Sequence, residues 1–364
     1  AHHSSLRAMK MRLEDLFPNG FLCAREGESH RMMRHDLQNA LRRLPEESAS
    51  CLGDSLRTIA ASELSRYQRQ GCSAAEPAAV YADAMLSMAT SMLITMSFGL
   101  APGSADHLRL CSLYRRLSTA NVVWNPGSRE VSAFAALRAF VESLAETCAS
   151  GSARISGRSL LLACQESGSL DESMIGNLIY QLETGRHDMK NLFRWLTFHT
   201  SRNPDLLARI AQERLRAEGS QPLARAVVWE TLRHDQSERL MRSVEADIVH
   251  EGHLIPRHSI VRLCLWESHH DESVFADPHR FDPDRFLAGS PGKDDFAPFG
   301  LDHHQCPMGS HVLLMGAVFL AELSRYRLTP FHAEGSRRGL FHWEPPKNFF
   351  VQLLPGDRTA QAAD

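Results

Sequence analysis

A stretch near the C-terminus, from Phe296 to Gly309, combines residue types that can hold a metal-containing ring. It reads F-A-P-F-G-L-D-H-H-Q-C-P-M-G, with Phe299, Gly300 and His304 seven, six and two residues before Cys306. This layout suits a loop beneath a flat, dianionic macrocycle. The aromatic ring would cover the ligand sulfur, the glycine would let the backbone approach, and the histidine could reach a propionate. Cysteine thiolate is among the few protein groups that ligate heme iron, and it favours O–O cleavage.

The stretch resembles the heme-binding loop of the cytochrome P450 superfamily, F-x-x-G-x-x-x-C-x-G, with two departures. Asp302 occupies the position of a second glycine, and Met308 precedes a glycine that arrives one place late, at Gly309. The resemblance implies that Cys306 is the proximal iron ligand of heme b (iron protoporphyrin IX). The alternative is an ordinary buried cysteine in a loop, since cysteine is among the most buried residue types.

Composition places the chain among globular proteins. It has 364 residues, of which 43% are hydrophobic and 23% charged, and a formal net charge of -3. Such a balance argues against disorder and against nucleic acid as a partner. The eight cysteines form no C-x-x-C pair, which favours reduced thiols in a cytoplasm over disulfides or a zinc site.

No apolar run in the sequence approaches the roughly 20 residues needed to span a bilayer. We therefore expect a soluble, cytoplasmic protein without a membrane partner. Residues 1–11 begin with Ala1-His2-His3 and can be a remnant of an expression tag, or disordered. The rest of the chain, within 1–364, is predicted to form a single domain.

His30 and Arg34 form the second informative motif, because residues four apart share one face of a helix. In the P450 family, H-x-x-x-R at a helix start supplies two cations to the heme propionates. A solvated basic helix face is the alternative. The motif lies closer to the start of the chain than in full-length relatives, so the resemblance predicts an N-terminal cap that is reduced or missing.

One long helix is predicted over residues 171–202, where apolar positions are spaced by three and four and Asn203-Pro204 ends the pattern. In the family this helix crosses the distal face of the heme. Its usual A-G-x-(D/E)-T falls on residues 184–188, which matches Gly185 but places His187 at the acid and Asp188 at the threonine. The resemblance therefore implies Gly185, His187 and Asp188 as the distal, oxygen-side wall. His187 and Asp188 would form a substitute proton relay, or the enzyme does not run ordinary dioxygen activation.

Glu183 and Arg186 flank Gly185 in the same helix. Either of these charged residues could point into the pocket and meet a polar ligand. The alternative, which is the more common situation for charged residues, is that both face solvent.

Glu230 and Arg233 form an E-x-x-R pair one helical turn apart. Downstream, F-D-P-D-R-F resembles the family segment whose arginine, here Arg285, joins the same glutamate in a structural cluster. Residues 243–248 and 259–263 between the two motifs have strand character. Arg242 opens that segment, where the family places another propionate-binding arginine.

The motifs appear in the family's order, so the sequence predicts a mainly α fold with small β-sheets, the triangular helical prism of the cytochrome P450 fold around a heme. The resemblance implies a monooxygenase-type oxidoreductase that acts on a small molecule, in bacterial specialised metabolism, with electrons from a separate ferredoxin-type partner. Peroxide-driven oxidation, bond formation between heteroatoms, dehydration or rearrangement are open alternatives. So is a catalytically silent accessory protein that binds and activates a partner enzyme, although such relatives typically lose the heme cysteine.

Overall fold

The computed structural model describes most of the chain in stretches separated by short gaps: residues 6–8, 21–22, 25–45, 50–70, 74–117, 127–149, 155, 157–216, 221–235, 239–289, 291–292, 294–301, 304–334 and 344–356. Within these stretches helices predominate, and the strands form three small antiparallel sheets. The mainly α fold with small β-sheets that the sequence predicts is confirmed.

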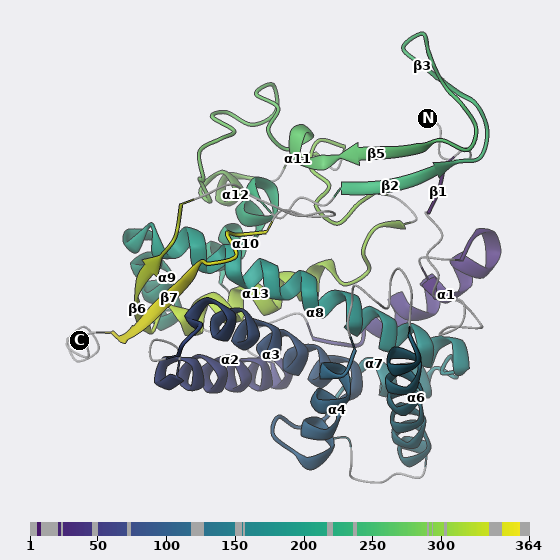
Figure 1. The fold of residues 1–364 in the computed structure, drawn as a ribbon, viewed down its shortest axis with the longest axis horizontal. Coiled ribbons are helices and arrows are strands. Elements are labelled where there is room, and N and C mark those ends of the chain that lie inside the picture. The colour runs from purple at the N-terminus through teal and green to yellow at the C-terminus, as the bar shows by residue number, and fades with distance from the viewer. Residues whose placement is uncertain are drawn as a thin grey trace.

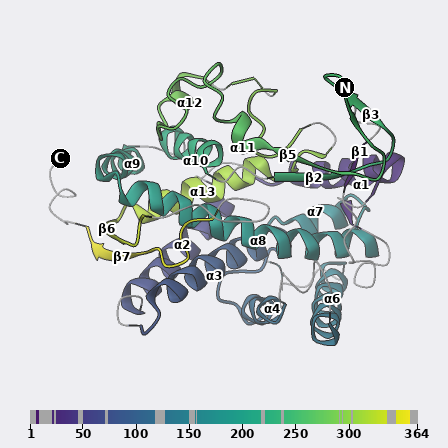
Figure 2. The same ribbon diagram turned by 45° about the horizontal axis from the view of Figure 1, so that its top comes forward.

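The helices surround one long central helix, α8, which crosses the middle of the molecule in both views (Figures 1 and 2). The first half of the chain supplies α1 (Gly27–Leu41), α2 (Cys51–Gln70), α3 (Pro77–Phe98), α4 (Ala105–Arg115), α6 (Ser128–Ala149) and α7 (Leu160–Glu166). The second half supplies α8 (Glu172–Ser201), α9 (Pro204–Arg216), α10 (Pro222–His234), α11 (Leu265–Ser268), α12 (Arg285–Ala288) and α13 (Gly309–Leu323).

The largest sheet lies at the edge of the helical body (Figure 1). Its strands have the order β1-β2-β5, formed by β1 (Leu6–Ala8), β2 (Arg239–Val244) and β5 (Ile260–Cys264). The two other sheets pair β3 (Ile248–His250) with β4 (His253–Ile255), and β6 (Tyr326–Phe331) with β7 (Phe350–Pro355).

Strand β1 differs from the sequence-based expectation for residues 1–11, which was a tag remnant or a disordered segment. Leu6 pairs with Val244 and Ala8 with Arg242, so this short piece extends the sheet at β2. The physical reason is that the edge of β2 offers unpaired backbone groups to any extended segment nearby. The other residues of 1–11 lie outside the described part of the chain.

Helix α8 begins and ends where local side chains satisfy the backbone. The Asp171 carboxylate accepts a hydrogen bond from the Met174 N–H (2.7 Å), as a good N-cap does. At the other end, Pro204 opens α9 and the Asn203 side chain accepts from the Leu206 N–H (3.0 Å). The predicted range 171–202 agrees with the observed Glu172–Ser201 to one residue at each end.

Helix α3 packs against both α2 and α8 and forms much of the core. The sequence-based expectation was that no segment is apolar enough over a sufficient length to span a bilayer. Helix α3 corrects this expectation, because its 22 residues are long and apolar enough to cross a membrane by length and composition. In the structure, 67% of its most apolar window is buried inside the protein. That burial is the packing of a core helix, in which apolar residues face neighbouring helices on all sides.

The predicted cluster around Glu230 is confirmed. Arg233 donates to both carboxylate oxygens of Glu230 (2.7 and 2.8 Å), and Arg285 Nε lies 3.2 Å from Glu230 Oε2. The remaining Nη1 of Arg233 donates to the carbonyls of His269 and Pro278 (2.9 and 2.8 Å). Glu230 and Arg233 are fully buried, so this paired charge holds α10 against the segment that leads to the cysteine loop.

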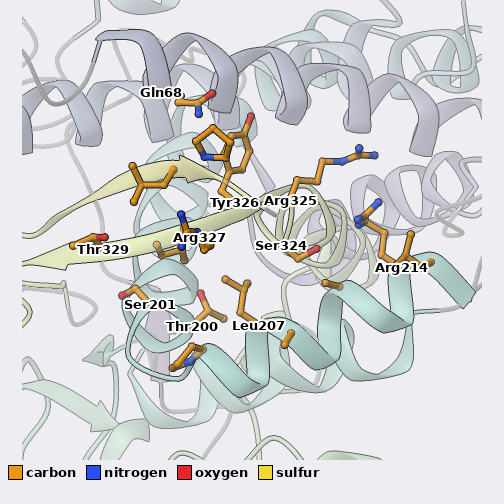
Figure 3. A pocket seen from close by; sticks show the side chains of 18 residues that line it. Gln68, Thr200, Ser201, Leu207, Arg214, Ser324, Arg325, Tyr326, Arg327 and Thr329 are labelled. Carbon is orange, nitrogen blue, oxygen red and sulfur yellow. The ribbon is translucent and has the colours of Figure 1, made fainter. Parts of the chain in front are cut away.

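A groove lies between α9, the end of α13 and the sheet of β6 and β7 (Figure 3). Gln68 from α2, Thr200 from α8, Leu207 from α9 and Tyr326 from β6 contribute to its wall. It shares no lining residue with the cavity beside Cys306 described below.

Candidate active site

The loop directly before α13 turns tightly enough to present Cys306. The Cys306 N–H donates to the Phe299 carbonyl (2.7 Å), and Gly300 adopts φ +78°, a left-handed conformation that glycine accepts without a Cβ clash. The Phe299 ring packs on Gly309, where a Cβ would come within 3.1 Å of it. The late glycine at 309 thus makes room for Phe299. Asp302, at the position of the family's second glycine, lies outside the described residues.

Cys306 is exposed, so the alternative of an ordinary buried cysteine is wrong. Its side chain lines a partly open cavity of about 200 Å³. Phe299 and Met308 line the same cavity from the loop, and Gly185 and Asp188 line it from α8. The structure therefore brings the predicted proximal ligand and two of the predicted distal residues to one space.

Three predicted cationic or donor residues gather beside the loop. His30 is buried on α1, and its ring centroid lies 4.4 Å from that of His304. Arg34, one turn further along α1, donates to the Gln305 carbonyl (2.8 Å). Burial lowers the pKa of Arg34, while the nearby Cys306 raises it. The structure thus places the H-x-x-x-R motif next to the cysteine instead of on a solvated face.

Arg242, the remaining predicted propionate contact, lies in the middle strand β2 and is half-buried. Its Nη1 donates to the carbonyl of Met241 (2.9 Å). Its role toward a propionate stays a prediction.

Asp188 lines the cavity, and its side chain is exposed there. Desolvation raises the pKa of its carboxyl to about 7, and the positive charge of Lys190 opposes the rise. A carboxyl with such a pKa exchanges its proton readily near neutral pH. Asp188 is therefore the titratable group best suited to proton transfer among the described residues that line this cavity.

His187 is not among the residues that line the cavity, in contrast to the distal wall that the sequence predicts. His187 points about 100° away from Asp188 around the helix axis, on the side of α8 that bears Glu183. The His187 Nε2 lies 3.6 Å from Glu183 Oε1. Burial lowers the pKa of His187, and the hydrogen bond to Glu183 partly offsets this.

Glu183 and Arg186 face neither the cavity nor solvent, which corrects both sequence-based alternatives. They form a buried ion pair, with Arg186 Nε and Nη2 donating to the Glu183 carboxylate at 2.9 and 3.0 Å. Arg186 also donates to the Tyr114 carbonyl (3.1 Å), which ties α8 to α4. The two side chains can neutralise each other's charge because residues three apart lie on one helix face.

Gln181, which no sequence motif indicated, lines the cavity one helical turn before Gly185. Its Oε1 is buried and accepts no hydrogen bond from the described part of the chain. The helical spacing of the sequence could have indicated this residue, because positions 181, 185, 188 and 192 share one face of α8 at spacings of four, three and four.

Comparisons with known proteins agree with this geometry. The family model for Cytochrome P450 matches residues 173–332. The retinoic acid-bound cyanobacterial CYP120A1 shares the fold with a TM-score of 0.70, at 19% sequence identity over 96% of this chain and 84% of that chain. This chain belongs to the cytochrome P450 superfamily. A six-coordinated cytochrome P450 from Thermus thermophilus gives a TM-score of 0.68, with 19% identity over 96% of this chain and 88% of the other.

Two curated relatives of this P450 are plant proteins. Ent-kaurenoic acid oxidase 1 from Hordeum vulgare is 28% identical over 228 residues, which are 57% of this chain and 46% of the relative. Abscisic acid 8'-hydroxylase 1 from Arabidopsis thaliana is 30% identical over 153 residues, 38% of this chain and 32% of the relative. This P450 chain thus spans less than half the length of these two relatives.

The residues of this P450 fit the heme-thiolate cofactor of its family. An accessible thiol lines the cavity, and an arginine with two histidines stands beside the loop, as an iron ligand and propionates require. Across the cavity, the one described atom that a Cβ added at Gly185 would meet is Leu93 Cδ1, at 3.6 Å. Protein packing therefore does not demand this glycine, and close approach to a bound group explains it better.

Proposed function

We propose that this chain is a heme-thiolate oxidoreductase of the P450 monooxygenase type that acts on an apolar small molecule. The observation that carries the proposal is one cavity lined by both Cys306 and Asp188. A ligating sulfur and a titratable acid facing one space are what oxidative chemistry at a heme needs. The cavity wall is otherwise largely apolar, with Leu93, Leu182, Met189, Leu192 and Val312 among its residues.

Heme, when bound, supplies the redox chemistry, and the protein supplies its ligand, its orientation and a pocket that excludes water. Cys306 would ligate the iron, while His30, Arg34 and His304 would meet the propionates. Their positions beside the loop support this assignment, since the charge of a propionate in a partly buried site requires nearby donors. Arg242 would add a further cation from β2.

Asp188 takes the role of the proton-handling residue on the distal side. The family's acid–alcohol pair is absent from residues 187 and 188, so one carboxyl with a pKa of about 7 would hold and release the proton. This difference supports oxygen or peroxide chemistry that departs from the usual family pattern. A separate ferredoxin-type protein would deliver electrons where dioxygen is used.

The relatives' names support an apolar organic substrate, because ent-kaurenoic acid, abscisic acid and retinoic acid appear in them. We place the activity in bacterial specialised metabolism, in the cytoplasm. The free cysteines among the described residues, such as Cys51 and Cys164, are in keeping with a reducing compartment.

The test is an absorption spectrum of the purified, heme-loaded protein after reduction and exposure to carbon monoxide. We expect the red-shifted Soret band of a heme-thiolate protein. Cys306→Ala should lose this band, whereas Cys51→Ala, which alters another exposed cysteine, should retain it. A wild-type protein that takes up little heme would instead favour the silent accessory function. Retention of the band in Cys306→Ala would refute the ligand assignment.

A further inference from the structure

Two histidines and an aspartate converge where the last turn of α8 meets the end of α10. His199 Nε2 lies 2.5 Å from Asp235 Oδ2, and His234 Nδ1 lies 2.7 Å from the same oxygen. The three donor atoms all lie within 4.8 Å of one another. The Asp235 side chain is fully buried and each histidine side chain is 9% exposed. Three potential metal ligands thus share one enclosed point.

The surroundings orient both imidazole rings toward that point. The Nε2 of His234 lies 3.0 Å from the His279 carbonyl, which can only accept, so this nitrogen carries a hydrogen and Nδ1 is turned to Asp235. A histidine that ligates a metal almost always donates its other N–H in this way. The ring of His199 stacks on Phe281, with centroids 3.8 Å apart and an angle of 8° between the planes.

We propose that His199, His234 and Asp235 form a binding site for a divalent transition-metal ion of the zinc class. Imidazole nitrogens with one carboxylate suit Zn²⁺, whereas Mg²⁺ and Ca²⁺ prefer oxygen donors alone. Zinc bonds of about 2.0–2.1 Å in a tetrahedron would separate the donor atoms to roughly 3.3 Å. Modest side-chain rotations from the observed 2.5 and 2.7 Å would achieve this separation.

The ion would act as a structural clamp that is distinct from the heme. His199 lies 11 residues beyond Asp188 on the same helix, which is about 16 Å along the axis. His234 and Asp235 directly follow Arg233 of the buried Glu230 cluster. The metal would therefore fasten the end of the distal helix to the helix that organises the cysteine loop.

The test measures zinc in the heme-loaded protein, in a His2→Ala, His3→Ala background that removes the two histidines of the N-terminus. After equilibration with micromolar Zn²⁺ and gel filtration, elemental analysis should find about one zinc per chain, counted separately from iron. Saturating Zn²⁺ should raise the melting temperature by roughly 4 °C. His199→Gln and Asp235→Asn should lose both effects, and His107→Gln, which alters a buried histidine on α4, should keep them.

A second measurement needs only the wild-type protein and therefore does not depend on whether the variants fold. Anomalous scattering at the zinc edge from wild-type crystals grown with Zn²⁺ should give a peak between His199, His234 and Asp235. Zinc that binds the cluster variants as well as the wild type would overturn the proposal. So would the absence of zinc from the wild-type protein, or a peak elsewhere only.

Discussion

Asp188 and Cys306 line the same cavity, although 118 residues separate them in the chain and they belong to different elements. Asp188 projects from the middle of α8, and Cys306 from the loop that precedes α13. Met189 lines the cavity beside Asp188, whereas His187 turns toward Glu183. The proton-handling role therefore rests on one carboxyl, and its titration can be followed.

Turnover should depend on pH near neutrality, because the pKa of Asp188 is raised to about 7 by desolvation. Asp188→Asn should abolish this titration and lower turnover by roughly 10²-fold, the low end for loss of a general acid or base. The measurement is the pH profile of substrate oxidation from pH 5.5 to 8.5. His187→Gln should retain the wild-type profile. An unchanged profile in Asp188→Asn would exclude the role.

Asp188 should also make stability fall as pH rises. Its folded pKa is raised from 3.8 to about 7, so between these values the unfolded chain loses a proton that the folded protein keeps. Stability therefore falls from about pH 4 to pH 7 on this account and levels off above it. Asp188→Asn should remove this loss and so raise the free energy of unfolding at pH 8. The expected gain is only roughly 1 kcal/mol, because water in the cavity screens the charge. Urea unfolding of the two proteins at pH 5 and pH 8 measures this, and an equal gain at both values would contradict it.

Glu230→Gln should destabilise the protein by about 3–5 kcal/mol, because Arg233 would remain buried without its counter-charge. Chemical denaturation at neutral pH gives the value. The matched control is Asp284→Asn, which breaks the exposed pair of Asp284 with Arg209 (2.6 Å) and should cost less than about 1 kcal/mol. Similar losses in the two variants would show that the buried cluster is not the stabilising feature.

Gly316→Ala should destabilise the contact between α10 and α13. A Cβ at this position would lie 2.6 Å from Val228 Cγ2, so the Val228 side chain or the two helices must shift. Overpacking of this kind costs about 1–3 kcal/mol, against a gain of up to about 1 kcal/mol in helix propensity. Thermal unfolding should show a lower melting temperature. Gly157→Ala, with no atom of the described residues within 4 Å of the added carbon, should change it little.

Gln181→Leu should affect ligand binding without lowering the stability of the protein. Its Oε1 is buried without a partner among the described residues, so its removal should leave stability unchanged or raise it by up to about 1 kcal/mol. A ligand that donates a hydrogen bond to this oxygen should bind the variant about tenfold more weakly. Thr184→Val is the control, because the Thr184 hydroxyl already donates to the Tyr180 carbonyl (3.2 Å). Ligand-induced spectral titrations compare the three proteins, and equal affinities would exclude a binding role for Gln181.

Several features of this P450 could be predicted from the sequence because they depend on residues close together in the chain. The spacing of His30 and Arg34 predicts one helix face, and Asn203-Pro204 predicts the end of the long helix. Gly300 allows the turn that presents Cys306. Short-range sterics and hydrogen bonds determine such features, and the family's motif order then placed the motifs around a common centre.

Only the tertiary structure decided which side chains meet. Glu183 and Arg186 look like pocket or surface residues in the sequence, yet α4 packs over them and makes them a buried pair. Residues 6–8 become a strand only because β2 offers an edge. His199 and Asp235 carry no shared motif, and they meet because two helix ends converge. Burial and partners depend on how distant segments pack, and no local pattern in the chain encodes that packing.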